Sequence, residues 1–179
     1  MSVSAAAERF LVISTMKNEG PYILEWLAHH RAIGFTDFLV FTNDCTDGTD
    51  LLLDRLTQRG LVVHERNQVL RRGPHKSALK HAFAQPLYAE AGWVFVADSD
   101  EFLNIRTGAG RVTDLVRYFP GADAVPVTWR MFSNAGLVGL PEGLVTECLT
   151  DAEPDTPAPG AKGRFVKTLF RRSGDIVQL

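Results

Sequence analysis

Four short apolar runs alternate with amphipathic stretches in the first hundred residues, and this alternation constrains the fold more than any other feature of the sequence. The runs are Phe10–Ile13, Phe38–Phe41, Leu61–His64 and Trp93–Ala97. The stretches between them are long enough for crossover helices, which is how consecutive parallel strands are joined. The pattern therefore predicts β-α-β units and an α/β fold class, with a mostly parallel sheet flanked by helices.

The first predicted helix follows the segment 18–21, which places Pro21 at or near the first helical position. Gly34 stands where a glycine commonly ends a helix. Apolar and aromatic residues recur at i, i+3, i+4 and i+7, as expected of the helix face that packs on a sheet: Ile23, Trp26, Leu27 and His30.

A second helix is predicted to start at Asp47–Asp50, with Asp47 as its cap, and to end at Gly60. Its inward residues are Leu52, Leu53 and Leu56. A third helix is predicted over Ser77–Ala91, interrupted or kinked near Pro86 because proline cannot donate the helical hydrogen bond.

The second half of the chain is less regular. It predicts a short apolar run at Phe102–Ile105, a helix at Thr113–Phe119, a strand at Asp123–Trp129 and a last strand at Arg164–Arg172. Thr150–Gly163 is rich in proline and glycine, which is typical of a loop that serves as a lid or as a plain connector.

Composition indicates one globular domain over residues 1–179. The net charge of −2 and the pI near 6.2 lack the electrostatic footprint of a nucleic-acid binder. The apolar runs are too short to span a membrane, and we find no signal peptide, so we expect a cytoplasmic protein. Cys45 and Cys148 fit neither a zinc site nor a disulfide framework, and we expect two free thiols.

Polar residues follow each predicted strand, at the edge where open α/β sheets bind ligands. They are Ser14–Thr15, Thr42–Asp44, Glu65–Arg66 and Asp98–Glu101. Hydroxyls, an amide, acids and nearby bases on one edge suit a ligand that carries sugar hydroxyls, phosphates and a divalent cation.

Asp98-Ser99-Asp100 is the sharpest local signal. Two carboxylates at i and i+2 can point to the same side and offer hard oxygen ligands to Mg²⁺ or Mn²⁺, which in turn bridges phosphate oxygens. Alone, such a tripeptide is more often a solvated turn. Its position directly after a five-residue apolar strand favours the metal site.

A basic loop precedes the third predicted helix. Lys76, Arg71 and Arg72 can meet a phosphate there together with the helix N-terminal amides, or they form a solvated loop. Asn43 and Asp44 can read a base or ribose edge by hydrogen bonding.

These residues together resemble the nucleotide-sugar glycosyltransferases of family 2, in the branch whose N-terminal signature is Lys-Asn-Glu. The resemblance rests on three motifs in order, and it extends faintly to Trp129–Phe132 and Lys167. The motifs are Lys17–Tyr22 with Glu25-Trp26 and His29-His30, then Asn43–Thr49, then Asp98–Phe102.

The resemblance implies a GT-A fold and transfer of a sugar from a nucleotide-diphosphate donor, with inversion at the anomeric carbon. It implies that Thr15, Asn43 and Asp44 hold the nucleoside and Lys76 the diphosphate. Asp98 and Asp100 would be the catalytic residues that hold the sugar diphosphate and the Mg²⁺ or Mn²⁺. The expected donor is a UDP-sugar, and the expected acceptor is a glycan or a lipid-linked molecule.

The resemblance divides the chain into a nucleotide-sugar-binding half, 8–105, and an acceptor-side half, 106–179. Related enzymes commonly continue further, so we expect Leu179 to mark a truncation or the protein to be a minimal member. The general base is expected in the second half, where Glu147, Asp151 and Glu153 are candidates. Trp129, Arg130 and Asn134 face an acceptor, or Trp129 is part of the core.

Two other functions stay open. A chain that ends at Leu179 fits a non-catalytic module that binds a nucleotide sugar. Asp98 followed by Asp100 also fits the nucleophile and acid of a haloacid dehalogenase-type phosphohydrolase, although that motif normally follows the first strand and here follows the fourth.

Overall fold

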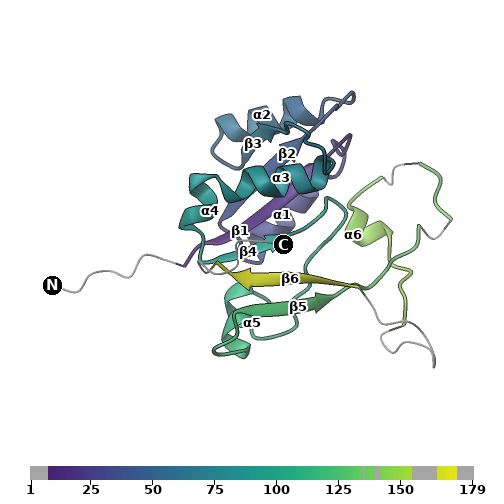
Figure 1. Cartoon of the computed structure of the whole chain (residues 1–179). Coiled ribbons are helices and arrows are strands. Elements are labelled where there is room, and N and C mark those ends of the chain that lie inside the picture. The colour runs from purple at the N-terminus through teal and green to yellow at the C-terminus, as the bar shows by residue number, and fades with distance from the viewer. Residues whose placement is uncertain (1–7, 135, 140–141, 155–164, 173–179) are drawn as a thin grey trace.

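The structure is a computed structural model that describes residues 8–134, 136–139, 142–154 and 165–172. Its centre is a six-stranded sheet with the order β3-β2-β1-β4-β6-β5 (Figure 1). The strands are β1 (Phe10–Met16), β2 (Asp37–Thr42), β3 (Val63–Arg66), β4 (Trp93–Val96), β5 (Ala124–Thr128) and β6 (Val166–Arg171). This arrangement confirms the predicted α/β class.

Strands β3, β2, β1 and β4 are parallel, and β6 joins β4 in the antiparallel direction. Because β6 runs opposite to β4, the amino end of β6 lies at the same edge of the sheet as the carboxyl ends of the parallel strands. Lys167, the second residue of β6, is thereby brought beside the segment that follows β4.

The described residues form six helices, of which only the short α6 was not predicted. Their bounds are α1 (Ile23–Ala32), α2 (Thr49–Gln58), α3 (Pro74–Phe83), α4 (Pro86–Glu90), α5 (Val112–Tyr118) and α6 (Val145–Cys148). None of the helices in the described ranges is long and apolar enough to cross a membrane.

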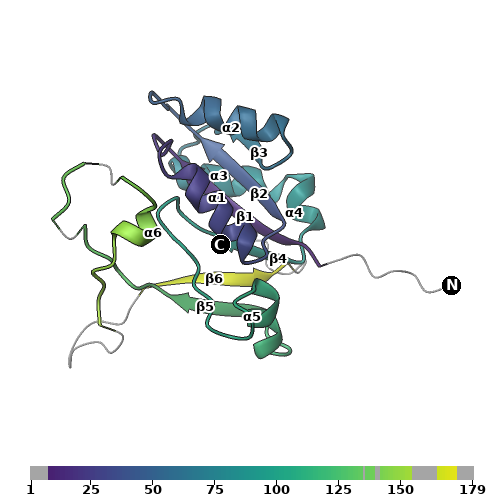
Figure 2. The ribbon, with the colours of Figure 1, turned by 180° about the vertical axis from the view of Figure 1, so that it is seen from behind.

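The helices cover both faces of the sheet. Figures 1 and 2 show α3 on one face and α1 on the other. Ile23, Trp26, Leu27 and His30 of α1 are all buried, which confirms the predicted helix face. Burial of each large apolar side chain stabilises the fold by roughly 1.5–3 kcal/mol.

The observed ends of the parallel strands differ from the predicted ones. Strand β2 includes Thr42, which was expected to follow it, and β4 ends at Val96, one residue earlier than predicted. Strand β1 continues to Met16, so Ser14 and Thr15 belong to the strand and do not follow it. Strand β3 lies two residues later than predicted, so Glu65 and Arg66 are also strand residues. Apolar runs marked the strand interiors correctly, but the backbone pairing extends over polar residues that the runs do not include.

The predicted long helix over 77–91 is two helices, α3 and α4. Gln85 between them has an extended backbone (ψ 143°), which suits the residue before a proline. Pro86 thus ends one helix and opens the next, as the sequence allowed.

The second half largely follows the prediction, with α5, β5 and β6 each within two residues of the expected bounds. Phe102–Ile105 forms neither a strand nor a helix, but Leu103 is buried in the core and Phe102 and Ile105 pack against it. Of the predicted loop at 150–163, residues 155–163 lie outside the described residues. Cys45 and Cys148 are both free, as expected.

Candidate functional site

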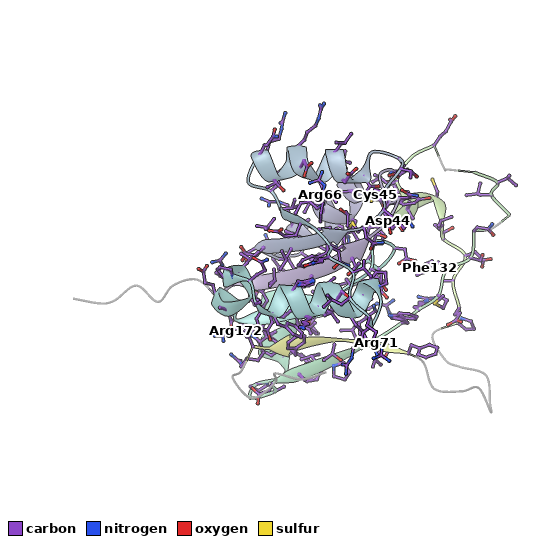
Figure 3. All side chains as sticks on the ribbon, turned by 45° about the horizontal axis from the view of Figure 1, so that its top comes forward. Asp44, Cys45, Arg66, Arg71, Phe132 and Arg172 are labelled. Carbon is purple, nitrogen blue, oxygen red and sulfur yellow. The ribbon has the colours of Figure 1, made fainter. Side chains whose placement is uncertain are left out.

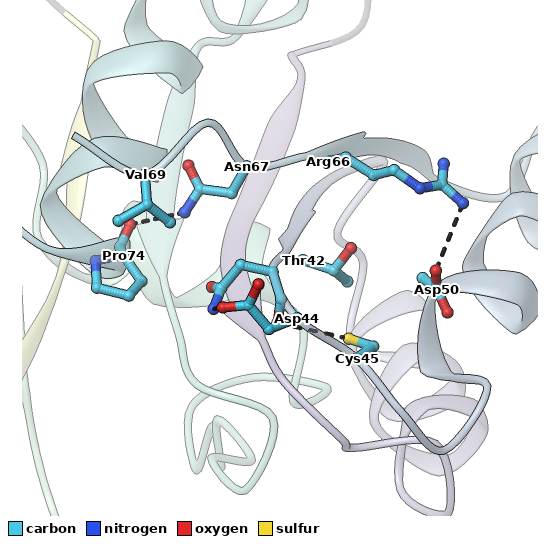
Figure 4. Close-up of a pocket in the computed structure, with 9 residues that line it drawn as sticks. Thr42, Asp44, Cys45, Asp50, Arg66, Asn67, Val69 and Pro74 are labelled. Carbon is cyan, nitrogen blue, oxygen red and sulfur yellow. Dashed lines mark hydrogen bonds and ion pairs between the residues drawn. The ribbon is translucent and has the colours of Figure 1, made fainter.

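A cavity of about 500 Å³ lies at the carboxyl ends of β2 and β3 (Figure 4). It is lined by Thr42, Asn43, Asp44, Cys45, Asp50, Arg66, Asn67, Val69 and Pro74. Figure 3 shows Asp44, Cys45 and Arg66 gathered at this end of the molecule, whereas Arg172 lies toward the other end. Asn43 and Asp44, both expected to bind a nucleoside, are therefore brought together in one pocket, which we call the β2–β3 pocket.

The loop after β2 holds an unusual backbone. Asp44 has a φ of 49°, and Asn18, which follows β1, has a φ of 58°. These are the non-glycine residues with positive φ in the part of the chain that the structure describes, and both lie at this edge. Such conformations cost free energy and persist where surrounding contacts enforce them.

One of those contacts joins the loops after β1 and β2. The Asn18 carbonyl Oδ1 accepts a hydrogen bond from the backbone N–H of Thr46 at 2.8 Å. Asp47 accepts bonds from the backbone N–H groups of Thr49 (2.9 Å) and Gly20 (3.2 Å). Its role is structural, as predicted, although it precedes the residue that caps α2.

The segment after β4 forms a turn held by a lysine. Lys167 Nζ lies 2.9 Å from Asp98 Oδ2 and 3.1 Å from Glu101 Oε2. Glu101 Oε2 also accepts the backbone N–H of Asp98 at 2.9 Å, which closes the turn. Asp100 in the same turn is exposed and makes no hydrogen bond to any described residue.

Charge and burial shift the pKa of Lys167 in opposite directions. Burial would lower the pKa of the Lys167 ammonium, but its hydrogen bond to Asp98 and the charge of Glu101 outweigh burial and raise it. Burial also raises the pKa of the Glu101 carboxyl. The lysine therefore stays protonated, and it occupies one oxygen of Asp98.

Glu19 connects this turn to the loops of β1 and β2. Burial is the main cause that raises the pKa of its carboxyl, and a hydrogen bond with Ser99 opposes that effect. The negative charges of Asp100, Asp47 and Asp98 raise it further. The sequence pointed to Glu19 only as part of a motif and did not indicate its contact with the Asp98–Asp100 turn.

The remaining predicted ligands lie further from the pocket lining. Thr15 is a half-buried residue within β1, not a residue after it. Lys76 is exposed in the first turn of α3, the helix whose first residue, Pro74, lines the pocket. Arg71 and Arg72 are exposed in the preceding loop. The helix start predicted for Lys76 is thus confirmed, and its role stays a prediction.

The sequence did not indicate a hydrogen-bonded chain that joins the pocket residues Thr42 and Arg66 through His64 and Asp54, with only His64 and Thr42 fully buried. Thr42 Oγ1 lies 2.8 Å from His64 Nε2, and His64 Nδ1 lies 2.8 Å from Asp54 Oδ1. Arg66 donates to both oxygens of Asp54 at 3.2 and 2.7 Å. Residues from two strands and a helix form this chain, so no local motif marks it.

A second hollow of about 300 Å³ lies in the second half of the chain, between 131–133 and 151–153. The segment containing α6 is attached to α1 through Glu25. This carboxylate accepts the backbone N–H of Val145 at 2.7 Å, and both the backbone N–H and the hydroxyl of Thr146 at 2.9 and 2.7 Å. Burial would raise the pKa of Glu25, but these bonds lower it.

The aromatic residues near β5 and β6 form a small cluster. Trp129 is half-buried, its ring centroid lies 5.6 Å from the Phe165 ring, and the Lys167 ammonium lies 5.6 Å from the Trp129 ring. Trp129 therefore lies beside the lysine that binds Asp98. Among the described residues, no three or more His, Cys, Asp or Glu side chains gather as they would around a metal ion.

Solved structures of other proteins share this fold. The chain resembles the structure of S. aureus TarS 1–349 in complex with UDP-GlcNAc, with 21% identity, a TM-score of 0.51, and coverage of 75% of this chain and 37% of that one. For TarS 1–349 in complex with UDP the values are 21%, 0.50, 75% and 38%. At this identity the likeness shows a shared fold, which confirms the expected GT-A type.

The chain thus spans less than two fifths of the TarS 1–349 fragment. A search of curated proteins finds no match. A sequence model of glycosyltransferase family 92 matches residues 13–136, well over half of the chain. The resemblance to a nucleotide-sugar glycosyltransferase is confirmed at that coarser level, whereas membership of family 2 is not confirmed. By this match the chain belongs to glycosyltransferase family 92.

Proposed function

We propose that this chain binds a nucleotide-diphosphate sugar, a UDP-sugar in the first instance, and transfers the sugar to a glycan or lipid-linked acceptor with inversion. The observation that carries the proposal is the β2–β3 pocket at the carboxyl edge of the sheet, with the Asp98–Asp100 turn two strands away. TarS, which shares the fold, is known in complexes with UDP and UDP-GlcNAc.

The spacing of the two features suits such a donor. Because β1 separates β2 from β4, their carboxyl ends lie about 10 Å apart. A ribose and a diphosphate can extend over that distance. With the base in the β2–β3 pocket, the diphosphate would pass the start of α3, where Lys76 and the helix N-terminus offer positive charge, and reach Asp98 and Asp100.

A divalent cation, Mg²⁺ or Mn²⁺, fits the described residues in one particular way. Magnesium sites with phosphate ligands usually use one or two carboxylates and several waters, without a full protein cage. Asp100 offers an exposed carboxylate without a hydrogen bond to the described residues, and Asp98 keeps one oxygen beyond the one that Lys167 holds. When bound there, the cation neutralises charge on the leaving diphosphate.

The residues of this chain then have separate roles. Asp44 and Asn43 hold the nucleoside, with Thr15 behind them in β1, and Lys76 meets the diphosphate. Lys167 holds Asp98 in place. The acceptor hydroxyl oxygen bonds to the anomeric carbon as the bond from that carbon to the diphosphate oxygen breaks, and the diphosphate leaves with the electron pair.

The proton of the acceptor hydroxyl must go to a carboxylate on the acceptor side. Glu147, Asp151 and Glu153 are the candidates in the described segment. Asp151 already accepts the hydroxyl of Ser133 at 2.9 Å, which is a competing engagement for that carboxylate. We propose the range 8–105 as the donor-binding half and 106–179 as the acceptor-side half.

Thermal unfolding with UDP, GDP and CMP, each with and without Mn²⁺, tests the proposal. We expect UDP with Mn²⁺ to raise the melting temperature most, because only a ligand that binds the native state stabilises it. The gain should be lost in Asp100→Asn and retained in Asp123→Asn, whose side chain is 72% exposed in an ion pair with Arg171. No metal-dependent stabilisation by any nucleotide would remove the proposal. Binding without donor turnover would select the non-catalytic module.

A further inference from the structure

We infer that Asp54, acting through His64, orients the Thr42 hydroxyl so that the β2–β3 pocket accepts a hydrogen bond from a nucleobase N–H. His64 and Asp54 are then positioning residues that set base specificity. The inference rests on the proposed function, since it assumes that the pocket holds the base of a nucleotide donor.

The three groups form a continuous chain from helix α2 to the floor of the pocket. The imidazole of His64 on β3 is fully buried, with 0% of the side chain exposed. Its two nitrogens lie 2.8 Å from Asp54 Oδ1 and 2.8 Å from Thr42 Oγ1. Thr42 is the last residue of β2 and one of the residues that line the pocket.

The partner of each nitrogen fixes the tautomer. A carboxylate can only accept hydrogen bonds, so His64 Nδ1 must carry a proton toward Asp54. Arg66 donates to both oxygens of Asp54 and already balances its charge. When the ring carries a single proton, that proton lies on Nδ1 and Nε2 presents a lone pair.

The Thr42 hydroxyl donates its hydrogen bond to that lone pair. This hydroxyl has a single proton, and the bond to His64 Nε2 uses it. Thr42 lines the pocket, and its hydroxyl then has only lone pairs left to offer, so it can only accept a hydrogen bond from a ligand. Without His64, the Thr42 hydroxyl could rotate and either donate or accept a hydrogen bond.

Two further side chains of the pocket also offer hydrogen-bond acceptors. Asn67 donates its amide N–H to the Pro74 carbonyl at 2.8 Å, and this leaves its Oδ1 as a buried acceptor without a hydrogen-bond partner in the described structure. Asp44 adds an exposed carboxylate (Figure 4). These acceptors, which share the pocket with the donors Arg66 and Asn43, favour a base edge that carries N–H, such as the imide of uracil. A base without an N–H is penalised because a buried acceptor then stays unpaired.

Asp54→Asn provides the sharpest perturbation, because it changes hydrogen-bond polarity at almost constant shape. Arg66 is a pure donor, so it binds the carbonyl oxygen of the new amide and turns the NH₂ toward His64. His64 Nδ1 then accepts, its proton moves to Nε2, and Nε2 donates to Thr42. The Thr42 proton is thereby released toward the pocket.

The experiment measures the dissociation constants of UDP and of the diphosphate of pyrimidin-2-one riboside, whose base lacks any N–H, by isothermal titration calorimetry. We expect the wild type to bind UDP about tenfold more tightly than the analogue, as one well-placed hydrogen bond allows. Asp54→Asn and Thr42→Val should each bring this ratio below about threefold. Thr42→Ser should restore it relative to Thr42→Val, and Thr57→Val, which removes a hydroxyl elsewhere in α2, should keep the wild-type ratio.

A double substitution tests whether Asp54 acts through the Thr42 hydroxyl or only supports the structure of the pocket. In the Thr42→Val background, Asp54→Asn should cause no further change in the ratio, because the group through which it acts is gone. An unchanged ratio in folded Asp54→Asn overturns the inference while leaving the proposed function intact. If Asp54→Asn does not fold, equal ratios for Thr42→Val and Thr42→Ser overturn it. Failure of the wild type to bind either nucleotide overturns the proposed function, and this inference with it.

Discussion

Acidification should weaken this fold through His30, a buried histidine of helix α1. The ring is fully buried and lies among the rings of Trp26, Phe35 and Phe102. Its Nδ1 donates to the backbone carbonyl of Trp26 at 2.9 Å, whereas Nε2 has no hydrogen-bond partner in the described structure. A proton added at Nε2 would create a buried charge without a counter-ion beside it.

The magnitude follows from the pKa of this ring. Burial lowers the pKa of His30 from 6.5 to about 4, against the hydrogen bond to Trp26. Between these two values the unfolded chain binds the proton and the native state does not, so the free energy of unfolding falls as the pH falls. At about 1.4 kcal/mol per pK unit, the full loss is about 3–4 kcal/mol, and most of it is reached by pH 4.5.

Urea unfolding of the wild type and of His30→Leu at pH 7.5 and pH 4.5 measures this loss. The leucine variant has no titrating group at this position, so its own change between the two pH values reports all the other groups. We expect the wild type to lose about 2–3 kcal/mol more than the variant. His75→Leu, at an exposed histidine, should behave as the wild type. Parallel losses in the wild type and His30→Leu would refute the reasoning.

Two further substitutions test contacts at the site. Lys167→Met removes the ammonium that pairs with Asp98, so we expect about tenfold weaker binding of UDP with Mn²⁺ by calorimetry. Because the ion pair is only partly buried, the free energy of unfolding should fall by about 1–2 kcal/mol. The exposed Lys80→Met is its matched control, and equal effects of the two would contradict the assignment. Glu25→Gln weakens the attachment of α6 to α1, and we expect at least tenfold faster hydrogen exchange at the α6 amides by mass spectrometry, with unchanged exchange in β1. Unchanged exchange in α6 would show that Glu25 does not hold it.

Much of the fold could be predicted because the chain repeats a simple physical pattern. Apolar runs and helix faces indicated the order of strands and helices, and Asp98 and Asp44 lie, as predicted, after the carboxyl ends of their strands. The strand ends were harder to predict. Thr15 lies inside β1 and Arg66 inside β3, because backbone pairing with the neighbouring strand holds polar residues that hydrophobicity alone assigns to loops.

The parts of the site that were missed depend on contacts between distant segments. Lys167 reaches Asp98 only because β6 enters the sheet in the antiparallel direction beside β4. His64 meets Thr42 and Asp54 only when β2, β3 and α2 are assembled. The resemblance extended to Lys167 without indicating its contact with Asp98, and the sequence shows His64 only as an isolated histidine.

Photo-cross-linking with 5-azido-UDP tests the central claim most directly, because it reports where a nucleotide lies. After irradiation and digestion, mass spectrometry identifies the labelled peptides. The account predicts labels within 42–50 or 66–74, around the β2–β3 pocket, and their loss when excess UDP competes. Labels confined to 131–133 or 151–153, the lining of the second hollow, or labels that UDP does not displace, would contradict it.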